Sequence, residues 1–466
     1  MKRLSAVLLV LLLLIGSAKS VSAHSAQSYW EGVDRTGAII TDGDCPIIVQ
    51  HELLTFDLQE FPQPHYSDEA AFLAYTGKVT AQYTFHNPSD MTVTAKLLFP
   101  FGPEPWYGSA SDADAQKYNI LINDVPVEKK IRHTLSYNDF NLDTDLPLVS
   151  DDFAEDPFYS PDLTVTVYRF AVSNLDSQTY KAAVVGFDVP KGIENRRFYL
   201  PAQRGAQLQD NGAMRVIASV KNAHIFSLYV FGEPLEPLSS MPNFKFYQDG
   251  GAENSRRING TATLSETETM TFKEFALENW NAESGISEID WYNATVTDLN
   301  NSARTEHPVV YRTNHANSFS NGFMRWYEYE ITLAPGEQII NTVTAPIYPS
   351  IDTTYDPDVY GYNYLLSPAS TWKSFGTLDV VINTPYYMTH STLNGFTKTA
   401  TGYKAHFDGL PNGELYFEMS ASENPERQNN GFNWAWLILL AAPLVLIAEV
   451  FEAIGEFFTN LFQNLF

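Results

Sequence analysis

Apolar and polar residues alternate along two neighbouring stretches of the chain. In the stretch 78–85 every second residue is apolar or aromatic, namely Val79, Ala81, Tyr83 and Phe85. The stretch 91–99 repeats the pattern with Met91, Val93, Ala95, Leu97 and Phe99. A period of two indicates strands with one buried face, and the His-Asn-Pro-Ser-Asp turn at 86–90 separates them. The pattern therefore predicts a β-hairpin over 83–102.

Similar strand patterns recur along most of the chain. Further strands are predicted at 117–123, 163–172, 214–220, 224–232, 325–333 and 377–383. A second hairpin is predicted from 402–407 and 414–419, around the turn Asp-Gly-Leu-Pro-Asn-Gly. Many short strands separated by turn residues are typical of antiparallel β-sandwiches. The fold is therefore expected to be mainly β.

The middle of the chain has a different pattern. The stretches 271–280 and 284–301 are predicted to be helical, and Ser284 or Ser287 can cap the second helix. One stripe of that helix carries Ile286, Ile289, Asn293, Val296 and Leu299. We expect an N-terminal β-sandwich domain at 24–235, a helical connector at 236–304 and a second β-sandwich domain at 305–421.

Both ends of the chain carry apolar segments. Residues 1–23 resemble a secretory signal, with Lys2 and Arg3 before an apolar run and cleavage after Ala23, or after Ala18. A polar linker at 422–431 precedes 432–448, which is uncharged and long enough for a transmembrane helix. Trp434 and Trp436 suit a membrane interface, and Pro443 can kink the helix.

The tail at 449–466 is amphipathic. Its polar stripe includes Glu449, Glu452 and Glu456, and the remainder is mostly apolar. This acidic stripe would lie at the membrane surface or form an assembly seam with another chain. A single-pass protein of the cell membrane with its large domain outside is the main expectation. The alternative is a soluble protein that packs this segment into its own groove.

Composition and charge narrow the possible functions. The 466 residues are 44% hydrophobic, which is enough for packed cores. The formal net charge of −26 disfavours nucleic-acid binding, which needs clustered Lys and Arg. Cys45 is the single cysteine, so an intrachain disulfide is impossible. A secreted chain of this size without disulfides fits a bacterial surface better than an animal one.

One acidic loop has the spacing of a calcium site. Oxygen-bearing side chains occupy every second position at Asp139, Asn141, Asp143 and Asp145. The EF-hand pattern then fails, because Thr144 stands where glycine is needed and Ser150 where the bidentate glutamate belongs. A different calcium loop and a solvated acidic loop both remain open. A weaker calcium candidate comprises Asp352, Asp356 and Asp358.

Catalytic motifs give little support for an enzyme. The sequence has no His-Glu-x-x-His, no Gly-x-Ser-x-Gly, no P-loop and no dinucleotide fingerprint. Ser370 and Lys373 form a Ser-x-x-Lys pair, but the other motifs of serine β-lactamases are missing. No catalytic residue and no certain cofactor is assigned, and calcium is the candidate ion.

The segment 83–132 resembles domains of the vault/inter-alpha-trypsin (VIT) type. The similarity covers about 79–132 and rests on "YTFHNPSD", "VTAKLLFPFG" and "YNILINDVPVEKKIR". The rest of the chain loosely resembles uncharacterised secreted bacterial β-proteins. The first resemblance implies a β-sandwich scaffold, often used in adhesion. Relatives often add a von Willebrand A domain with Asp-x-Ser-x-Ser, and Asp176-Ser177-Gln178-Thr179 departs from that motif.

The expected function is a binding or structural role, assisted by calcium, for a membrane-anchored β-sandwich protein on a bacterial surface. The partners would be the membrane, a surface protein or glycan, and further chains joined through the C-terminal helix in a homo- or hetero-oligomer. Two alternatives remain: a surface hydrolase acting on glycan or cell-wall polymer, and a subunit of a membrane assembly.

Overall fold

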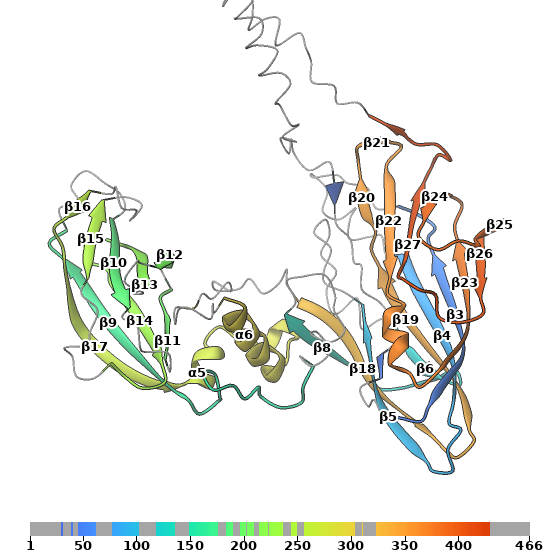
Figure 1. Ribbon diagram of the computed structural model, residues 1–466, viewed down its shortest axis with the longest axis horizontal. Coiled ribbons are helices and arrows are strands. Elements are labelled where there is room, and N and C mark those ends of the chain that lie inside the picture. The colour runs from blue at the N-terminus through green and yellow to red at the C-terminus, as the bar shows by residue number, and fades with distance from the viewer. Residues whose placement is uncertain are drawn as a thin grey trace, which may run out of the picture. The chain divides into compact units, whose positions relative to one another are not determined.

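The computed structural model shows a mainly β protein with few helices, which confirms the coarse fold prediction (Figure 1). It describes 45–61, 77–101, 118–135, 149–175, 183–189, 196–201, 203–208, 214–221, 223–235, 244–248, 256–302, 310 and 323–428, together with the short strands β1 (Tyr29–Trp30) and β2 (Ile39–Ile40). Within these residues no helix is long and apolar enough to cross a membrane.

The chain divides into two compact units. The larger contains Trp30–Ile351 and Tyr360–Met419. The described part of the smaller unit is Tyr29, 352–359 and 420–428, and within it β21 (Tyr355–Asp356) pairs with β28 (Glu426–Arg427). Ser420 holds this small unit together by donating its hydroxyl hydrogen bond to the carbonyl oxygens of Pro357 and Asp358.

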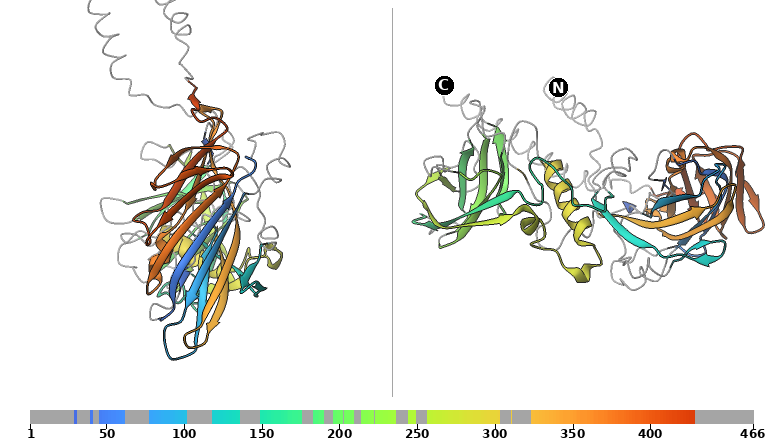
Figure 2. Two further views of the ribbon diagram at one scale, coloured as in Figure 1. Left: turned by 90° about the vertical axis from the view of Figure 1, so that its right-hand side faces the viewer. Right: turned by 90° about the horizontal axis from the view of Figure 1, so that it is seen from below.

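The largest sheet of the larger unit has eight strands in the order β25-β26-β23-β3-β4-β19-β6-β7. Figure 2 shows, in its left view, strands from early and late parts of the chain side by side in this sheet. Strand β3 runs parallel to β23, whereas β4 runs antiparallel to β19. The bounds are β3 (Ile48–Asp57), β4 (Gly77–His86), β6 (Ile120–Ile122), β7 (Val125–Pro126), β19 (Gln338–Ile347), β23 (Phe375–Asn383), β25 (Thr397–Thr399) and β26 (Gly402–Phe407).

These pairings differ from the expected division of the chain at 235 and 305. Strands β3 and β4 were expected in one sandwich and β19 and β23 in another, but they are neighbours in one sheet. The parallel β3–β23 pair also departs from a purely antiparallel fold. The physical reason is that their apolar faces are buried in one shared core cluster, to which early and late strands contribute together.

Two further sheets contribute to the same core. One has the order β2-β5-β18-β8, with β5 (Val93–Pro100), β18 (Phe323–Leu333) and β8 (Lys130–Leu135). The other has the order β1-β20-β22-β27-β24, with β20 (Ser350–Asp352), β22 (Val359–Tyr364), β27 (Leu415–Ser420) and β24 (Tyr387–Ser391). Their inward side chains meet those of the eight-stranded sheet in the shared core. We call these three sheets the main sandwich.

Both hairpin predictions are wrong, although the strands themselves lie where they were expected. Strand β4 belongs to the eight-stranded sheet and β5 to the four-stranded sheet, and β26 and β27 are likewise divided between two sheets. Each turn is therefore an arch between sheets. The first arch follows from the pairing, because β4 pairs with β19 in one sheet and β5 pairs with β18 in the other. The segments β4–β5 and β18–β19 therefore both pass from one sheet to the other at the same place.

Asn87 links the turn between β4 and β5 to the turn between β18 and β19. It is fully buried, and its side-chain amide nitrogen donates to the carbonyl oxygens of Met91 (2.7 Å), Leu333 (3.2 Å) and Ala334 (3.1 Å). Its side-chain oxygen accepts from the backbone and hydroxyl groups of Ser89. The residue predicted only as part of a turn is thus a buried hydrogen-bond centre.

A second β-sandwich, which we call the inserted module, lies in sequence between β8 and β18. Its sheets have the orders β11-β14-β9-β17 and β12-β13-β10-β15-β16, and apolar side chains of both form one core cluster. The bounds are β9 (Thr164–Ser173), β10 (Ala183–Val189), β11 (Arg197–Tyr199), β12 (Gln203–Leu208), β13 (Met214–Val220), β14 (Ile225–Phe231), β15 (Lys245–Gln248), β16 (Arg257–Ile258) and β17 (Thr261–Thr271).

The helices follow the inserted module directly, and the expected helical connector at 236–304 differs from the structure because β15, β16 and β17 occupy its first part. They are α5 (Phe272–Ala276), the 3₁₀ turn η3 (Ala282–Ser284) and α6 (Glu288–Ser302). The expected cap of α6 is confirmed for Ser287, whose hydroxyl accepts from the Asp290 amide at 3.0 Å. Helix α6 is buried on most sides because it contributes to two clusters, one with α5 and strands β9 and β14, the other with Leu135 and Phe323.

Candidate functional site

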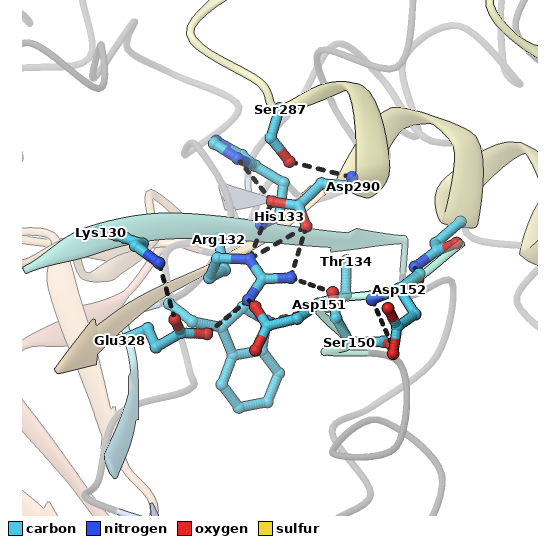
Figure 3. A network of polar contacts seen from close by, with 12 residues as sticks. Lys130, Arg132, His133, Thr134, Ser150, Asp151, Asp152, Ser287, Asp290 and Glu328 are labelled. Carbon is cyan, nitrogen blue, oxygen red and sulfur yellow. Dashed lines mark hydrogen bonds and ion pairs between the residues drawn. The ribbon is translucent and has the colours of Figure 1, made fainter. Parts of the chain in front are cut away.

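Among the described residues, the strongest concentration of buried charge surrounds Arg132 on β8. Arg132 is opposite Trp326 of β18, and Lys130 is opposite Glu328. Alternation along the strands sends Arg132 and Glu328 away from the core side on which Tyr327 and Tyr329 pack. Figure 3 shows Asp290 of α6 and the segment 150–152 meeting Arg132 on this outer side.

Arg132 uses all of its hydrogen-bond donors. Its Nε donates to both Asp290 oxygens at 3.1 and 3.3 Å, and Nη2 donates to Asp290 Oδ1 at 3.0 Å. Nη1 donates to Asp151 Oδ1 at 3.0 Å and to Glu328, and Nη2 also donates to the Ser150 carbonyl oxygen (Figure 3). One guanidinium thus binds three carboxylates from three separate segments. We call this group the Arg132 cluster.

Asp290 is the most enclosed carboxylate of the cluster. Its side chain is 3% exposed and also accepts from the backbone amide of His133 at 3.0 Å. Burial by itself would raise the pKa of Asp290, but hydrogen bonds from His133 and Arg132, together with the Arg132 charge, hold the pKa below its usual value. Asp290 is therefore an anion at neutral pH.

Two lysines complete the charge balance at the rim. Lys96 forms an ion pair with Asp151, and Lys130 Nζ lies 3.8 Å from Glu328 Oε1. The hydrogen bond to Lys96 is the main cause that lowers the pKa of Asp151. Because three cations match three carboxylates, the cluster holds β8, β18, α6 and 150–152 together without an excess charge. Such a balanced set of ion pairs is better suited to holding these four segments together than to transferring protons.

A shallow depression adjoins the cluster. It has a volume of about 350 Å³ and is lined by 127–130 and 328–330. Lys129 contributes from one side, where it donates to the Tyr118 carbonyl oxygen and lies 5.3 Å from the centre of the Tyr327 ring. Burial lowers the pKa of Lys129. The depression offers ammonium and carboxylate groups to a small polar ligand.

A second buried acid lies inside the main sandwich. Glu52 of β3 is 1% exposed and accepts a hydrogen bond from Tyr364 at 3.2 Å, and Tyr364 in turn contacts the Tyr83 hydroxyl at 3.2 Å. Burial raises the pKa of Glu52 to about 7, although hydrogen bonds from Tyr83 and Tyr364 oppose the rise. Both hydroxyl groups are buried in the same core. The acid is thus part of the packing.

A third polar group lies on the exposed face of the eight-stranded sheet. Asp379 bridges two histidines, with one oxygen 2.9 Å from His51 Nε2 and the other 2.7 Å from His406 Nδ1. Hydrogen bonds from His51 and His406 lower the pKa of Asp379, and the bond to Asp379 raises the pKa of His406. No group of three or more His, Cys, Asp or Glu in the described ranges is arranged to hold a metal ion.

Most sites expected from the sequence lie outside the described residues. This holds for the calcium loop with Asp139, Asn141, Asp143 and Asp145, for the anchor residues Trp434, Trp436 and Pro443, and for the seam residues Glu449, Glu452 and Glu456. The signal at 1–23 lies outside as well. These expectations stay predictions.

Two weaker candidates lie within the described chain. Asp352 accepts hydrogen bonds from the amide and hydroxyl of Thr354, and burial, with the nearby Asp356 and Asp352, raises the pKa of Asp358. Ser370, in the 3₁₀ turn η5 (Ser367–Thr371), donates its hydroxyl to the Ser367 carbonyl oxygen at 2.6 Å. Within the described residues, the side-chain hydrogen bonds of Asp352 and Ser370 thus stabilise the turns in which these residues lie.

The sequence reasoning missed both buried clusters, although it contained a signal for each. Glu52 shares its strand face with Leu54 and Phe56, so alternation alone places an acid among core residues. For Arg132 the signal is weaker, because alternation places it with Lys130 on the outer face of β8, and other segments cover that face only in the fold. What the pattern could not supply is the partner of each group, because those partners lie on distant segments.

No family model and no curated protein matches the chain. One solved structure, described as that of a proposed nutrient-binding protein from Legionella pneumophila, aligns over 84% of this chain and 72% of its own at 10% identity, with a TM-score of 0.34.

Proposed function

We propose that this protein is a binding or structural component of a bacterial cell surface, secreted through residues 1–23 and held in the membrane by 432–448. In this proposal the main sandwich and the inserted module form the external part, and calcium binds the loop at Asp139–Asp145. The VIT-like resemblance of 79–132 fits such a scaffold role.

The Arg132 cluster is the observation that carries the structural part of the proposal, whereas the location rests on the sequence of 1–23 and 432–448. A catalytic carboxylate or base must keep a position open for substrate. Here Arg132 has all its donors engaged, and Asp290 accepts from two neighbouring residues in an enclosed position. Arg132 and Asp290 are engaged and enclosed by their own chain, which favours a role in holding segments together over one in chemistry at this centre.

The test is to locate the protein in a bacterial host. We compare the full chain with a variant that ends after Arg427, and we treat intact cells with an external protease. The full chain should sediment with membranes, lose its external part to the protease and start at residue 24. The shorter variant should appear in the medium. A full chain that keeps residues 1–23 and stays inside the cell would overturn the proposal.

A second measurement separates the scaffold from a surface hydrolase. Purified full chain is incubated with cell-wall polymer and with a panel of glycans, and released sugars are quantified. We expect no turnover above the background of a heat-denatured sample. Sustained turnover that follows the protein concentration would favour the hydrolase alternative, whatever the location of the protein.

A further inference from the structure

Strand β17 forms an unusually long edge of the inserted module. It pairs with β9 from Thr261 opposite Ser173 to Thr271 opposite Thr164, with a bulge at Ser265 that shifts the register between Leu264 and Glu266. Among the described pairings it has no second neighbour, so it is an edge of its sheet (Figure 1). Edge strands expose one row of backbone N–H and C=O groups, and natural sheets usually keep such edges short. Eleven residues are about twice the usual strand length.

The centre of this strand is open on both of its faces. Residues 265–269 are all exposed, whereas four consecutive residues of the neighbouring strand β9, at 165–168, are all buried. In a half-buried strand, alternate side chains would be covered. We call the stretch 265–269 the β17 edge. A further extended segment could lie along it without displacing any described side chain of the core.

The chemistry of the β17 edge selects among possible partners. It contains Glu266 and Glu268 and no basic residue. Arg169 of β9 contacts both, at 3.4 and 2.7 Å, yet Glu266 stays 62% exposed and Glu268 46% exposed. One arginine cannot neutralise two carboxylates, so this face keeps an excess negative charge. Opposite charges on facing strands stabilise pairing, and like charges oppose it.

A second copy of this chain fits the edge poorly. Antiparallel pairing of two β17 edges about their centre would bring Glu266 and Glu268 of one copy against the same residues of the other. The net charge of −26 adds long-range repulsion between copies. We propose that the β17 edge is a strand-addition site for an extended, basic segment of a partner protein, with Lys or Arg at alternate positions facing Glu266 and Glu268.

The binding test uses the full chain and a fluorescent eight-residue peptide that alternates threonine and lysine. Two control peptides keep the length: one has glutamate in place of lysine, and the other keeps lysine but carries N-methyl groups on alternate backbone amides. The lysine peptide should bind and slow hydrogen exchange of the 265–269 amides. The N-methylated peptide keeps the charge but loses strand pairing, so it should bind much more weakly.

Charge reversal tests the site on the protein. E266K/E268K should weaken binding of the lysine peptide about tenfold, because two favourable cross-strand pairs become repulsive. The matched control is E278K/E283K, which changes the same charge at two exposed positions outside β17 and should leave affinity nearly unchanged. Circular dichroism melting checks that both variants fold.

Three results would overturn the proposal. The first is an absence of lysine-peptide binding to the wild-type chain at millimolar concentration. The two glutamates would then serve only to prevent other strands from pairing with the edge. The second is equal binding of the N-methylated peptide, which would show simple charge attraction. The third is a wild-type dimer in sedimentation that E266K/E268K abolishes, because the edge would then serve self-association.

Discussion

Glu52 in the main sandwich and Asp290 in the Arg132 cluster are both buried carboxyls, yet their pKa values move in opposite directions. Among the described residues, the hydrogen-bond partners of Glu52 are tyrosine hydroxyls, and its pKa rises to about 7. Asp290 meets Arg132 and the His133 amide, and its pKa falls. Burial acts on both, so the difference comes from the partner: a cation compensates the lost hydration, and a neutral hydroxyl does so only in part.

Removing the cation gives the largest expected effect. Arg132→Met should lower the free energy of unfolding by about 3–5 kcal/mol, because Asp290 and Glu328 are then buried without compensation. Urea denaturation at pH 7 measures the change. Lys130→Met is the matched control, and its loss should stay below about 1 kcal/mol because Lys130 is 72% exposed.

A double-mutant cycle with Asp290→Asn sharpens this result. If the two groups act as a pair, Asp290→Asn should cost much less in the Arg132→Met background than in the wild type. If Asp290→Asn lowers the free energy of unfolding equally in both backgrounds, the Arg132 charge does not account for the difference between Asp290 and Glu52.

Glu52 should give the next largest effect, visible as a pH dependence. The unfolded chain ionises near pH 4.5, whereas folded Glu52 ionises near pH 7. The stability contributed by protonated Glu52 is therefore complete below pH 4.5 and is lost as the pH rises towards 7. The expected loss is about 3 kcal/mol.

Glu52→Gln tests this dependence directly. The variant should lack this part of the stability loss between pH 4.5 and 7, as followed by denaturant unfolding at several pH values. Glu330→Gln, at an exposed position of β18, is the control and should leave the profile as in the wild type. A Glu52→Gln profile that parallels the wild type would place the pKa of Glu52 near its ordinary value.

Asn87 extends the comparison to a buried group without charge. Asn87→Ala should cost about 2 kcal/mol, because the carbonyl oxygens of Leu333 and Ala334 lose a donor at the crossing of the arches. Thermal and urea unfolding measure the change, with exposed Asn424→Ala as the control. A loss as small as that of the control would show that water replaces the amide.

The smallest effect is expected at the exposed Asp379 cluster. Asp379→Asn should lower the pKa of His406 towards its ordinary value, because the raised pKa comes mainly from the hydrogen bond to Asp379. Nuclear magnetic resonance titration of the histidine ring measures this shift. The pairing belongs to protonated His406, so its contribution disappears as the pH rises through the raised pKa. The effect on stability should be smaller than at Asn87, since solvent screens exposed pairs.

Particular elements show how far sequence patterns reach. The strand predicted at 214–220 coincides with β13, and the residues Val79, Ala81, Tyr83 and Phe85 are all buried as their alternation predicts. Met91 was placed on the same apolar face as Phe99 but is 65% exposed, because the strand begins only at Val93. Local spacing predicts faces well and strand ends less well.

The sequence alone determined where many of the strands lie, which of their faces are apolar and that Ser287 can cap α6, because each of these depends on neighbours within a few residues. It missed β15, β16 and β17, which lie in the stretch expected to be a helical connector. Only the tertiary structure decided that β4 pairs with β19 and β5 with β18, and that Arg132 meets Asp290. Those choices depend on burying the apolar faces of distant segments together and on compensating the charges buried with them.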